Sequence, residues 1–189
     1  PIEFSFRDMW PPFWEGRSLS SGDIDRDGDL DLVIASTWKG LYVLLNDGMG
    51  QFTPAKPNLG GLADIPVFNA ALVDIDNDGW LDLFITTYLS GNHILHNVEG
   101  QFDVAKLTTV KNQDHAVLTL GLSFGDVDHD GDLDVALGNW AAGWYRRIPG
   151  NESRNRVVFN DAGQINGSNF LAVPTPPVET LSILFSDIN

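Results

Sequence analysis

The stretch Asp23-Ile24-Asp25-Arg26-Asp27-Gly28-Asp29-Leu30-Asp31 follows the pattern D-x-D-x-D-G-x-x-D. The same nine-position pattern recurs at 74–82 and at 126–134, so consecutive copies begin 51 and 52 residues apart. A period of about 50 residues is the size of one propeller blade or one large solenoid unit. The three loops therefore indicate a protein built from repeated units.

The residues around each loop repeat as well. A short apolar run follows each copy, at 32–35, 83–86 and 135–138, and reads as a buried strand. A second strand is expected at 41–46 and 93–97, each ending in an Asn that lies 15 residues after the last Asp of the loop. In the third unit the matching residue is Asn160, 26 residues after Asp134, which predicts an insertion within 140–154.

No segment shows a helical period, and 19 glycines and 10 prolines punctuate the chain at the spacing of turns. The expected fold is therefore all-β, with about four short strands in each unit.

The loop has the chemistry of a calcium site. Calcium takes six to eight hard oxygen ligands, and aspartates at positions 1, 3 and 5 of a tight turn can point at one centre. Glycine at position 6 allows the positive φ that turns the chain back. Position 7, which is Asp29, Trp80 and Asp132 in the three copies, offers its backbone carbonyl, and position 9 supplies a fourth carboxylate.

Charge repulsion favours a bound cation over an empty acidic turn. Four carboxylates about 5 Å apart form six like-charge pairs, each costing roughly 3 kcal/mol at an effective dielectric of ~20. That total exceeds the stability of a typical domain. Magnesium fits less well, because it keeps its waters and prefers stricter octahedral geometry. An EF-hand is excluded, because position 12 is Ile34, Ile85 and Leu137 instead of a bidentate Glu.

The overall composition excludes several classes of function. The chain has 26 acidic and 11 basic residues, so a nucleic-acid partner is not expected. Twelve of the acidic residues are the aspartates at positions 1, 3, 5 and 9 of the three loops. The lack of cysteine excludes disulfides, thiolate zinc sites and cysteine nucleophiles. No run of 18 apolar residues predicts a membrane span.

The acidic loop, the strand after it and the turn Asn97-Val98-Glu99-Gly100-Gln101-Phe102 resemble FG-GAP/VCBS repeats. Such repeats form the β-propeller of integrin α-subunits and occur in many secreted bacterial proteins. The resemblance covers roughly residues 19–189. It implies blades of four antiparallel strands, calcium in a loop between neighbouring strands, and an extracellular or periplasmic location. Three blades cannot close a ring, so we expect further blades of a larger propeller, or another chain, to cover the open edges.

The resemblance and the spacing of the three loops assign the predicted calcium ligands and the boundaries of the units. The ligands are Asp23, Asp25, Asp27 and Asp31, then Asp74, Asp76, Asp78 and Asp82, then Asp126, Asp128, Asp130 and Asp134, with the backbone carbonyls of Asp29, Trp80 and Asp132. The units are expected at 19–69, 70–121 and 122–182. Residues 1–18 would be a strap or the end of a preceding blade. Residues 183–189 would begin a fourth repeat, in which Asp187 and Asn189 start an incomplete fourth calcium loop.

The leading functional hypothesis is a calcium-stabilised scaffold for protein recognition or adhesion, with no catalytic activity of its own. The alternative is a carbohydrate-binding module, or an accessory domain of a larger secreted enzyme. Either partner would contact the insertion, where Trp140, Trp144, Tyr145 and Arg146 are the candidate residues.

Intrinsic catalysis is disfavoured, because no nucleophile motif is present and the histidines are scattered. His93 and His96 are three residues apart on a strand, so they face opposite sides and make a poor metal pair. His129 occupies position 4 of the third loop, where its side chain is expected to point outward, as are those of Arg26 and Asn77.

Overall fold

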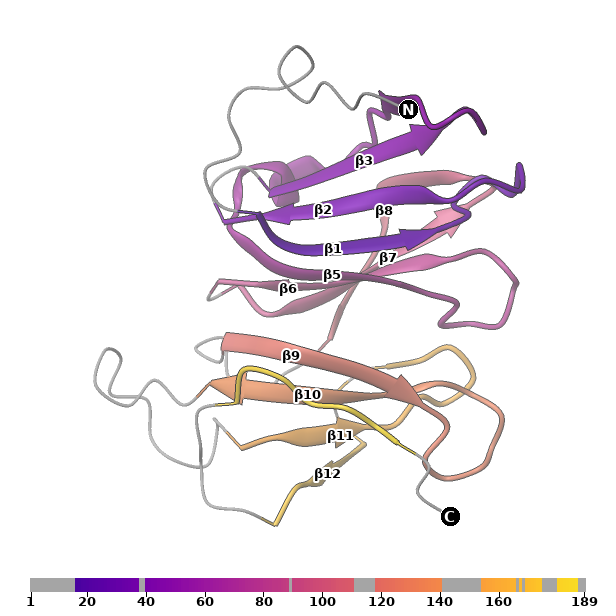
Figure 1. The fold of residues 1–189 in the computed structure, drawn as a ribbon. Coiled ribbons are helices and arrows are strands. Elements are labelled where there is room, and N and C mark those ends of the chain that lie inside the picture. Colours follow the sequence, from indigo (N-terminus) through magenta and orange to yellow (C-terminus); the bar gives the residue numbers. More distant parts are fainter. Residues whose placement is uncertain are drawn as a thin grey trace.

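The computed structural model describes residues 16–37, 40–88, 90–110, 118–140, 154–165, 167, 169–174 and 180–186. Within these ranges the chain forms three four-stranded antiparallel sheets and one short 3-10 helix, η1 (Gly60–Asp64) (Figure 1). The all-β fold with four strands in each unit is thereby confirmed. None of the described residues forms a helix long and apolar enough to span a membrane.

The strands of each sheet follow one another along the chain. The first sheet contains β1 (Gly16–Gly22), β2 (Asp31–Ser36), β3 (Gly40–Asn46) and β4 (Phe52–Pro54). The second contains β5 (Val67–Val73), β6 (Asp82–Thr87), β7 (Asn92–Val98) and β8 (Gln101–Val110). The third contains β9 (Leu118–Gly125), β10 (Asp134–Trp140), β11 (Arg156–Val158) and β12 (Phe170–Ala172).

Each acidic loop joins the first two strands of its sheet. The register of these strands is the same in all three units, because the residue before the loop pairs with the Asp at position 9: Gly22 with Asp31, Val73 with Asp82, and Gly125 with Asp134. The loops therefore leave equivalent ends of the three sheets.

The first strands of successive sheets lie side by side (Figure 1). The Ser18 hydroxyl of β1 accepts a hydrogen bond from the Ala70 N–H of β5 at 3.0 Å, and the Ser20 hydroxyl accepts one from the Leu72 N–H at 3.1 Å. The Asn69 amide of β5 in turn donates to the Leu120 carbonyl of β9. Hydrogen bonds from side chain to backbone thus connect neighbouring sheets, between which the described strands do not pair through their backbones.

Residues 180–186 lie against β9 as β5 lies against β1. The Phe185 N–H donates to the Ser123 hydroxyl at 2.9 Å, and this bond matches the bond from Leu72 to Ser20. Both serines stand three residues before an acidic loop, and both donors stand two residues before an Asp that begins an observed or expected loop. Asp187 and Asn189 lie outside the described residues, and the fourth repeat stays a prediction.

Strand β6 of the central sheet is buried on both faces. Leu83 and Ile85 of β6 belong to a core shared with the first sheet, whereas Phe84 belongs to a core shared with the third. Successive residues of a strand point to opposite faces, so a strand between two sheets needs a continuous apolar run. All six residues of β6 are buried accordingly.

Two segments named from the sequence lie outside the described residues. They are the expected N-terminal strap, apart from its last residues 16–18, and residues 141–153 of the insertion. The unit boundaries between residues 19 and 182 stay predictions.

Replacing Phe84 by Ala should destabilise the contact between the second and third sheets. Its ring is fully buried and meets Phe124 of β9 edge to face, with ring centroids 5.6 Å apart. We expect the free energy of unfolding, measured by denaturant titration, to fall by about 3–5 kcal/mol. Met49→Ala is the control, because that side chain is 78% exposed and should change stability by less than about 0.5 kcal/mol. Equal effects of the two changes would contradict this packing.

Candidate metal sites

The backbone of each loop holds its own aspartates. In the first loop the position 1 carboxylate, Asp23, accepts the N–H groups of Asp27 at 3.1 Å and Gly28 at 3.0 Å. The position 5 carboxylate, Asp27, accepts the N–H of Asp29 at 3.0 Å. The third loop repeats all three bonds, and the second repeats the bonds from Gly79 to Asp74 and from Trp80 to Asp78. These bonds give the three copies one common turn.

Two positions of the loop adopt left-handed backbone conformations. The position 6 glycines have φ of 98°, 86° and 97°, as the pattern predicts. Position 4 is also left-handed, with φ of 60° at Arg26, 57° at Asn77 and 66° at His129. A side chain at such a φ is disfavoured by roughly 1–2 kcal/mol. Sequence reasoning missed this second constraint, because position 4 holds a different residue in each copy.

The turn gathers three carboxylates in each copy. The groups Asp23, Asp25 and Asp27, then Asp74, Asp76 and Asp78, then Asp126, Asp128 and Asp134 each place one oxygen per residue within 4.8 Å of the others. Positions 1 and 3 belong to the cluster in every loop. Three of the four predicted side chains therefore converge in each loop, at a spacing that a single cation can bridge, whereas Asp31, Asp82 and Asp130 are not members of these three groups.

The carboxyl group at position 3 has a raised pKa in all three loops. Burial raises the pKa of Asp25, and the neighbouring carboxylates Asp27 and Asp31 raise it further. The pKa of Asp76 is raised by burial and then by Asp82 and Asp78. Desolvation within the loop raises the pKa of Asp128 as well, with Asp130 and Asp134 as further causes. A cation at the centre of each cluster would reverse this penalty on the ionised forms.

The donor set fits a hard cation. Every side-chain donor in the three clusters is a carboxylate oxygen, which is the ligand that calcium prefers. Two of these oxygens, Oδ1 of Asp25 and Oδ1 of Asp74, are buried without a hydrogen-bond partner. Buried acceptors of this kind normally have a partner, so both have the capacity to bind an ion.

The aspartates at position 9, Asp31, Asp82 and Asp134, are buried, and we call them the brace aspartates. In the first unit Asp31 accepts the Ile24 N–H from position 2 of the loop and the Asn46 N–H from β3, both at 2.8 Å. The other two units repeat this pair of bonds, at Ile75 and Asn97 and at Val127 and Asn160. Asp31 and Asp82 thus tie their loops to β3 and β7, and Asp134 ties its loop to Asn160, two residues after the end of β11. Their role as fourth calcium ligands stays a prediction.

We call Asn46, Asn97 and Asn160 the brace asparagines, and two of them, Asn97 and Asn160, also connect neighbouring units. The Asn97 amide donates to the Leu81 carbonyl of its own loop at 3.1 Å and to the Ile24 carbonyl of the preceding loop at 2.9 Å. The Asn160 amide does the same with Leu133 and Ile75. The bond from the Asn160 N–H to Asp134 makes Asn160 equivalent to Asn46 and Asn97. All three side-chain oxygens are buried without a hydrogen-bond partner.

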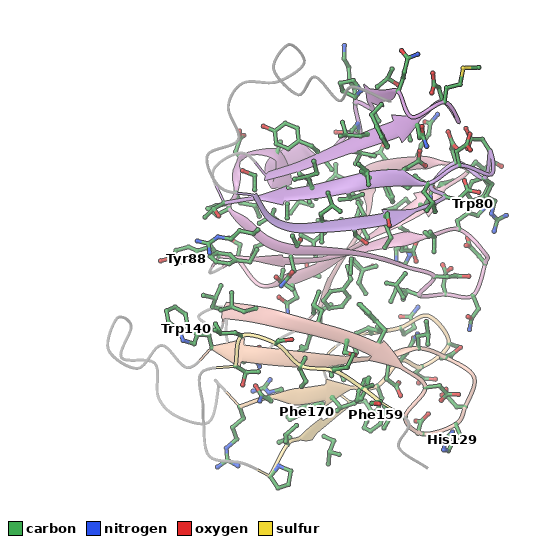
Figure 2. All side chains as sticks on the ribbon, in the orientation of Figure 1. Trp80, Tyr88, His129, Trp140, Phe159 and Phe170 are labelled. Atoms are coloured by element: carbon green, nitrogen blue, oxygen red, sulfur yellow. The ribbon has the colours of Figure 1, made fainter. Side chains whose placement is uncertain are left out.

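Position 4 connects successive loops along the surface. The Arg26 guanidinium lies over the Trp80 ring at 4.2 Å and donates to the Gly79 carbonyl at 3.0 Å. The Asn77 amide donates to Asp132 of the third loop at 2.7 Å. These side chains are exposed but reach sideways to the next loop, which corrects the expectation that they point outward. Figure 2 shows Trp80 and His129 at the loop ends of the sheets.

The remaining candidate residues are only partly placed. Trp140 is half-buried at the end of β10 (Figure 2), whereas Trp144, Tyr145 and Arg146 lie outside the described residues. His93 is buried against the Ser90 carbonyl at 3.0 Å and the Thr109 hydroxyl at 3.2 Å. Burial lowers its pKa. The two histidines of β7 do not meet, as the spacing indicates.

His96 is a neighbour of the second loop that sequence reasoning missed. Its Nδ1 lies 3.3 Å from Asp82 and 3.7 Å from Asp76. The hydrogen bond to Asp82 raises the pKa of His96, against the effect of burial. The signal available in the sequence was its place directly before the brace asparagine Asn97.

Three four-stranded antiparallel sheets, each with an acidic loop between its first two strands, define a repeat protein of the β-propeller type. The family described as FG-GAP-like repeat matches residues 23–85 and 74–137, which together span more than half of the chain. The chain belongs to this family, so the resemblance seen in its loops and turns is confirmed. No curated protein matches it.

Asn97→Ala should lower stability more than Asn46→Ala. Asn97 is buried and bonds two carbonyls in two different units, whereas the Asn46 amide donates to Leu30 of its own unit at 3.2 Å. Leaving buried carbonyls unpaired costs about 1–3 kcal/mol, and we expect a loss in that range for Asn97→Ala in chemical denaturation. A loss no larger than that of Asn46→Ala would show that the bond between units contributes nothing.

Proposed function

We propose that this chain is a calcium-stabilised, extracytoplasmic scaffold of the β-propeller type that recognises another protein and has no catalytic activity of its own. The observation that carries the proposal is the threefold convergence of carboxylates within 4.8 Å, on one common turn. A single acidic turn is an ordinary surface feature. Three equivalent turns with raised pKa values at position 3 favour a shared ligand.

Calcium at these loops would act on the whole fold. Each loop is bound to its own sheet through a brace aspartate and to the neighbouring unit through Asn97 or Asn160. An ion that orders the loop therefore also orders the contact between units, and binding energy becomes folding energy. Dependence on three such ions favours an environment outside the cytosol, where calcium is abundant.

Recognition suits these repeats better than catalysis. FG-GAP repeat domains are generally non-catalytic, and such repeat domains usually mediate protein interactions. The two histidines of β7 have structural partners: His93 bonds backbone and Thr109, and His96 bonds a brace aspartate. We place the recognition surface at the insertion that begins after Trp140, because it is the part of the chain that departs most from the repeat.

Removal of calcium should lower the melting temperature. A site filled at 100 times its Kd adds about 2.7 kcal/mol, which corresponds to roughly 5–10 °C for a chain of this size. We expect differential scanning calorimetry to show a loss of at least this size when EGTA is added, with recovery in calcium and weaker recovery in magnesium. A melting temperature that does not change when EGTA is added would rule out structural calcium.

A matched pair of variants gives the control for this experiment. Asp25→Asn removes a carboxylate from the first cluster and should reduce the calcium bound, measured by elemental analysis after dialysis, from three ions to two. Asp64→Asn removes an exposed carboxylate outside the loops and should leave three ions bound. An equal loss of calcium in both variants would mean that binding is diffuse.

Trp144→Ala should weaken partner binding and leave the melting temperature unchanged. The probes are a panel of extracellular proteins and a glycan array, both tested in calcium against the wild-type chain. We expect binding to proteins and reduced binding by the variant. Binding to glycans alone would favour the carbohydrate-binding alternative. A large stability loss in Trp144→Ala would instead make this residue part of a core.

A further inference from the structure

The second unit differs from the other two at the residue before its brace asparagine. The bonds between brace aspartate and brace asparagine make Asn46, Asn97 and Asn160 equivalent. The residue before each is Leu45, His96 and Phe159 respectively. At this position only the second of these three units has an imidazole, whereas the other two have an apolar side chain.

The imidazole and two carboxylates have the spacing of metal ligands. His96 Nδ1 lies 3.3 Å from Asp82 Oδ2 and 3.7 Å from Asp76 Oδ2, and all three donor atoms lie within 4.8 Å of one another. Two ligands about 2.0–2.1 Å from a tetrahedral ion are roughly 3.3 Å apart. The three atoms can therefore bind one small cation with little movement.

The second loop also holds its brace aspartate less tightly. The bond from the position 2 N–H to Asp82 Oδ2 is 3.3 Å long, against 2.8 Å for the equivalent bonds to Asp31 and Asp134. The same Oδ2 faces His96 Nδ1. Asp82 Oδ2 thus interacts with both the loop N–H and the imidazole. In the other two units the residue equivalent to His96 is apolar and makes no such second interaction.

An adjoining cavity gives access to this group. It has a volume of about 370 Å³, and Asp76, His96 and Asn97 line it together with Lys106 and Gln164. Asn97 is only 2% exposed, and its Oδ1 is buried without a hydrogen-bond partner. The equivalent oxygens of Asn46 and Asn160 also have no partner, but the side chains before them are apolar. Only at Asn97, among these three, does such an oxygen accompany an imidazole.

We propose that the second unit binds a divalent transition metal of the zinc type through His96 Nδ1, Asp76 and Asp82. Imidazole nitrogen suits zinc, cobalt and nickel, whereas calcium prefers oxygen alone. Because Asp76 and Asp82 are also positions 3 and 9 of the second loop, this metal competes with calcium there and not at the first or third loop. The competition rests on the proposed function, whereas the transition-metal site itself does not.

The test uses Co²⁺ as a spectroscopic probe on the whole chain, at about pH 8. Wild-type protein should develop the visible absorption bands of cobalt with a nitrogen ligand at one equivalent. His96→Leu, which introduces the residue of the first unit, should lose these bands and bind Zn²⁺ at least about tenfold more weakly by calorimetry. Circular dichroism confirms folding, and His96→Gln serves as a second variant that keeps a polar side chain beside Asp82.

The control is His129→Asn, which removes a histidine from the third loop and introduces the residue found at Asn77. It should keep the bands. Absence of the bands in wild-type protein, or their persistence in both His96 variants, would overturn the site and leave only adventitious binding to carboxylates.

Calcium is tested separately in the same samples. Displacement of Co²⁺ by excess calcium, with calcium binding at the other loops retained in His96→Leu, would support the competition. The calcium proposal would be refuted if the cobalt bands persisted at every calcium concentration and EGTA did not change the melting temperature. The same result would support the transition-metal site.

Discussion

The fold depends on a buried carboxylate that is shared between a loop and a brace asparagine. Asp31, Asp82 and Asp134 are each 0–1% exposed, and each accepts one backbone N–H from its loop and one from a brace asparagine of its unit. A buried charge is costly unless its oxygens are bonded, so each brace aspartate stabilises one arrangement of loop and sheet. The acidic loop is therefore part of the framework as well as a candidate metal site.

The same framework extends from one unit to the next. Asn97 and Asn160 bond the loop of the preceding unit, and Arg26 and Asn77 bond the loop of the following one. Beneath these polar contacts β6 packs apolar residues against both neighbouring sheets. Each unit contributes little core of its own, which is the general condition of repeat proteins. Whatever orders one loop must therefore act on its neighbours.

The second unit shows how a repeat acquires individual chemistry without changing its backbone. His96 and Trp80 occupy positions where the other units have apolar or acidic residues, yet the register of the strands is the same. Trp80, expected to contribute only its backbone, also stacks under Arg26. The chemical differences between units are thus set by side chains in and beside the acidic loop.

The sequence by itself determined the period, the three turns, the strands after them and the correspondence of Asn160 with Asn46 and Asn97. These features depend on residues close together in the chain, where spacing decides geometry. Only the tertiary structure decided that Arg26 lies over Trp80, that Asn97 reaches Ile24 and that His96 meets Asp82 and Asp76. Those contacts join residues that are 14 to 73 positions apart in the sequence. Except for the contacts of His96, all of them connect two different units. They depend on how the sheets pack, which no local pattern encodes.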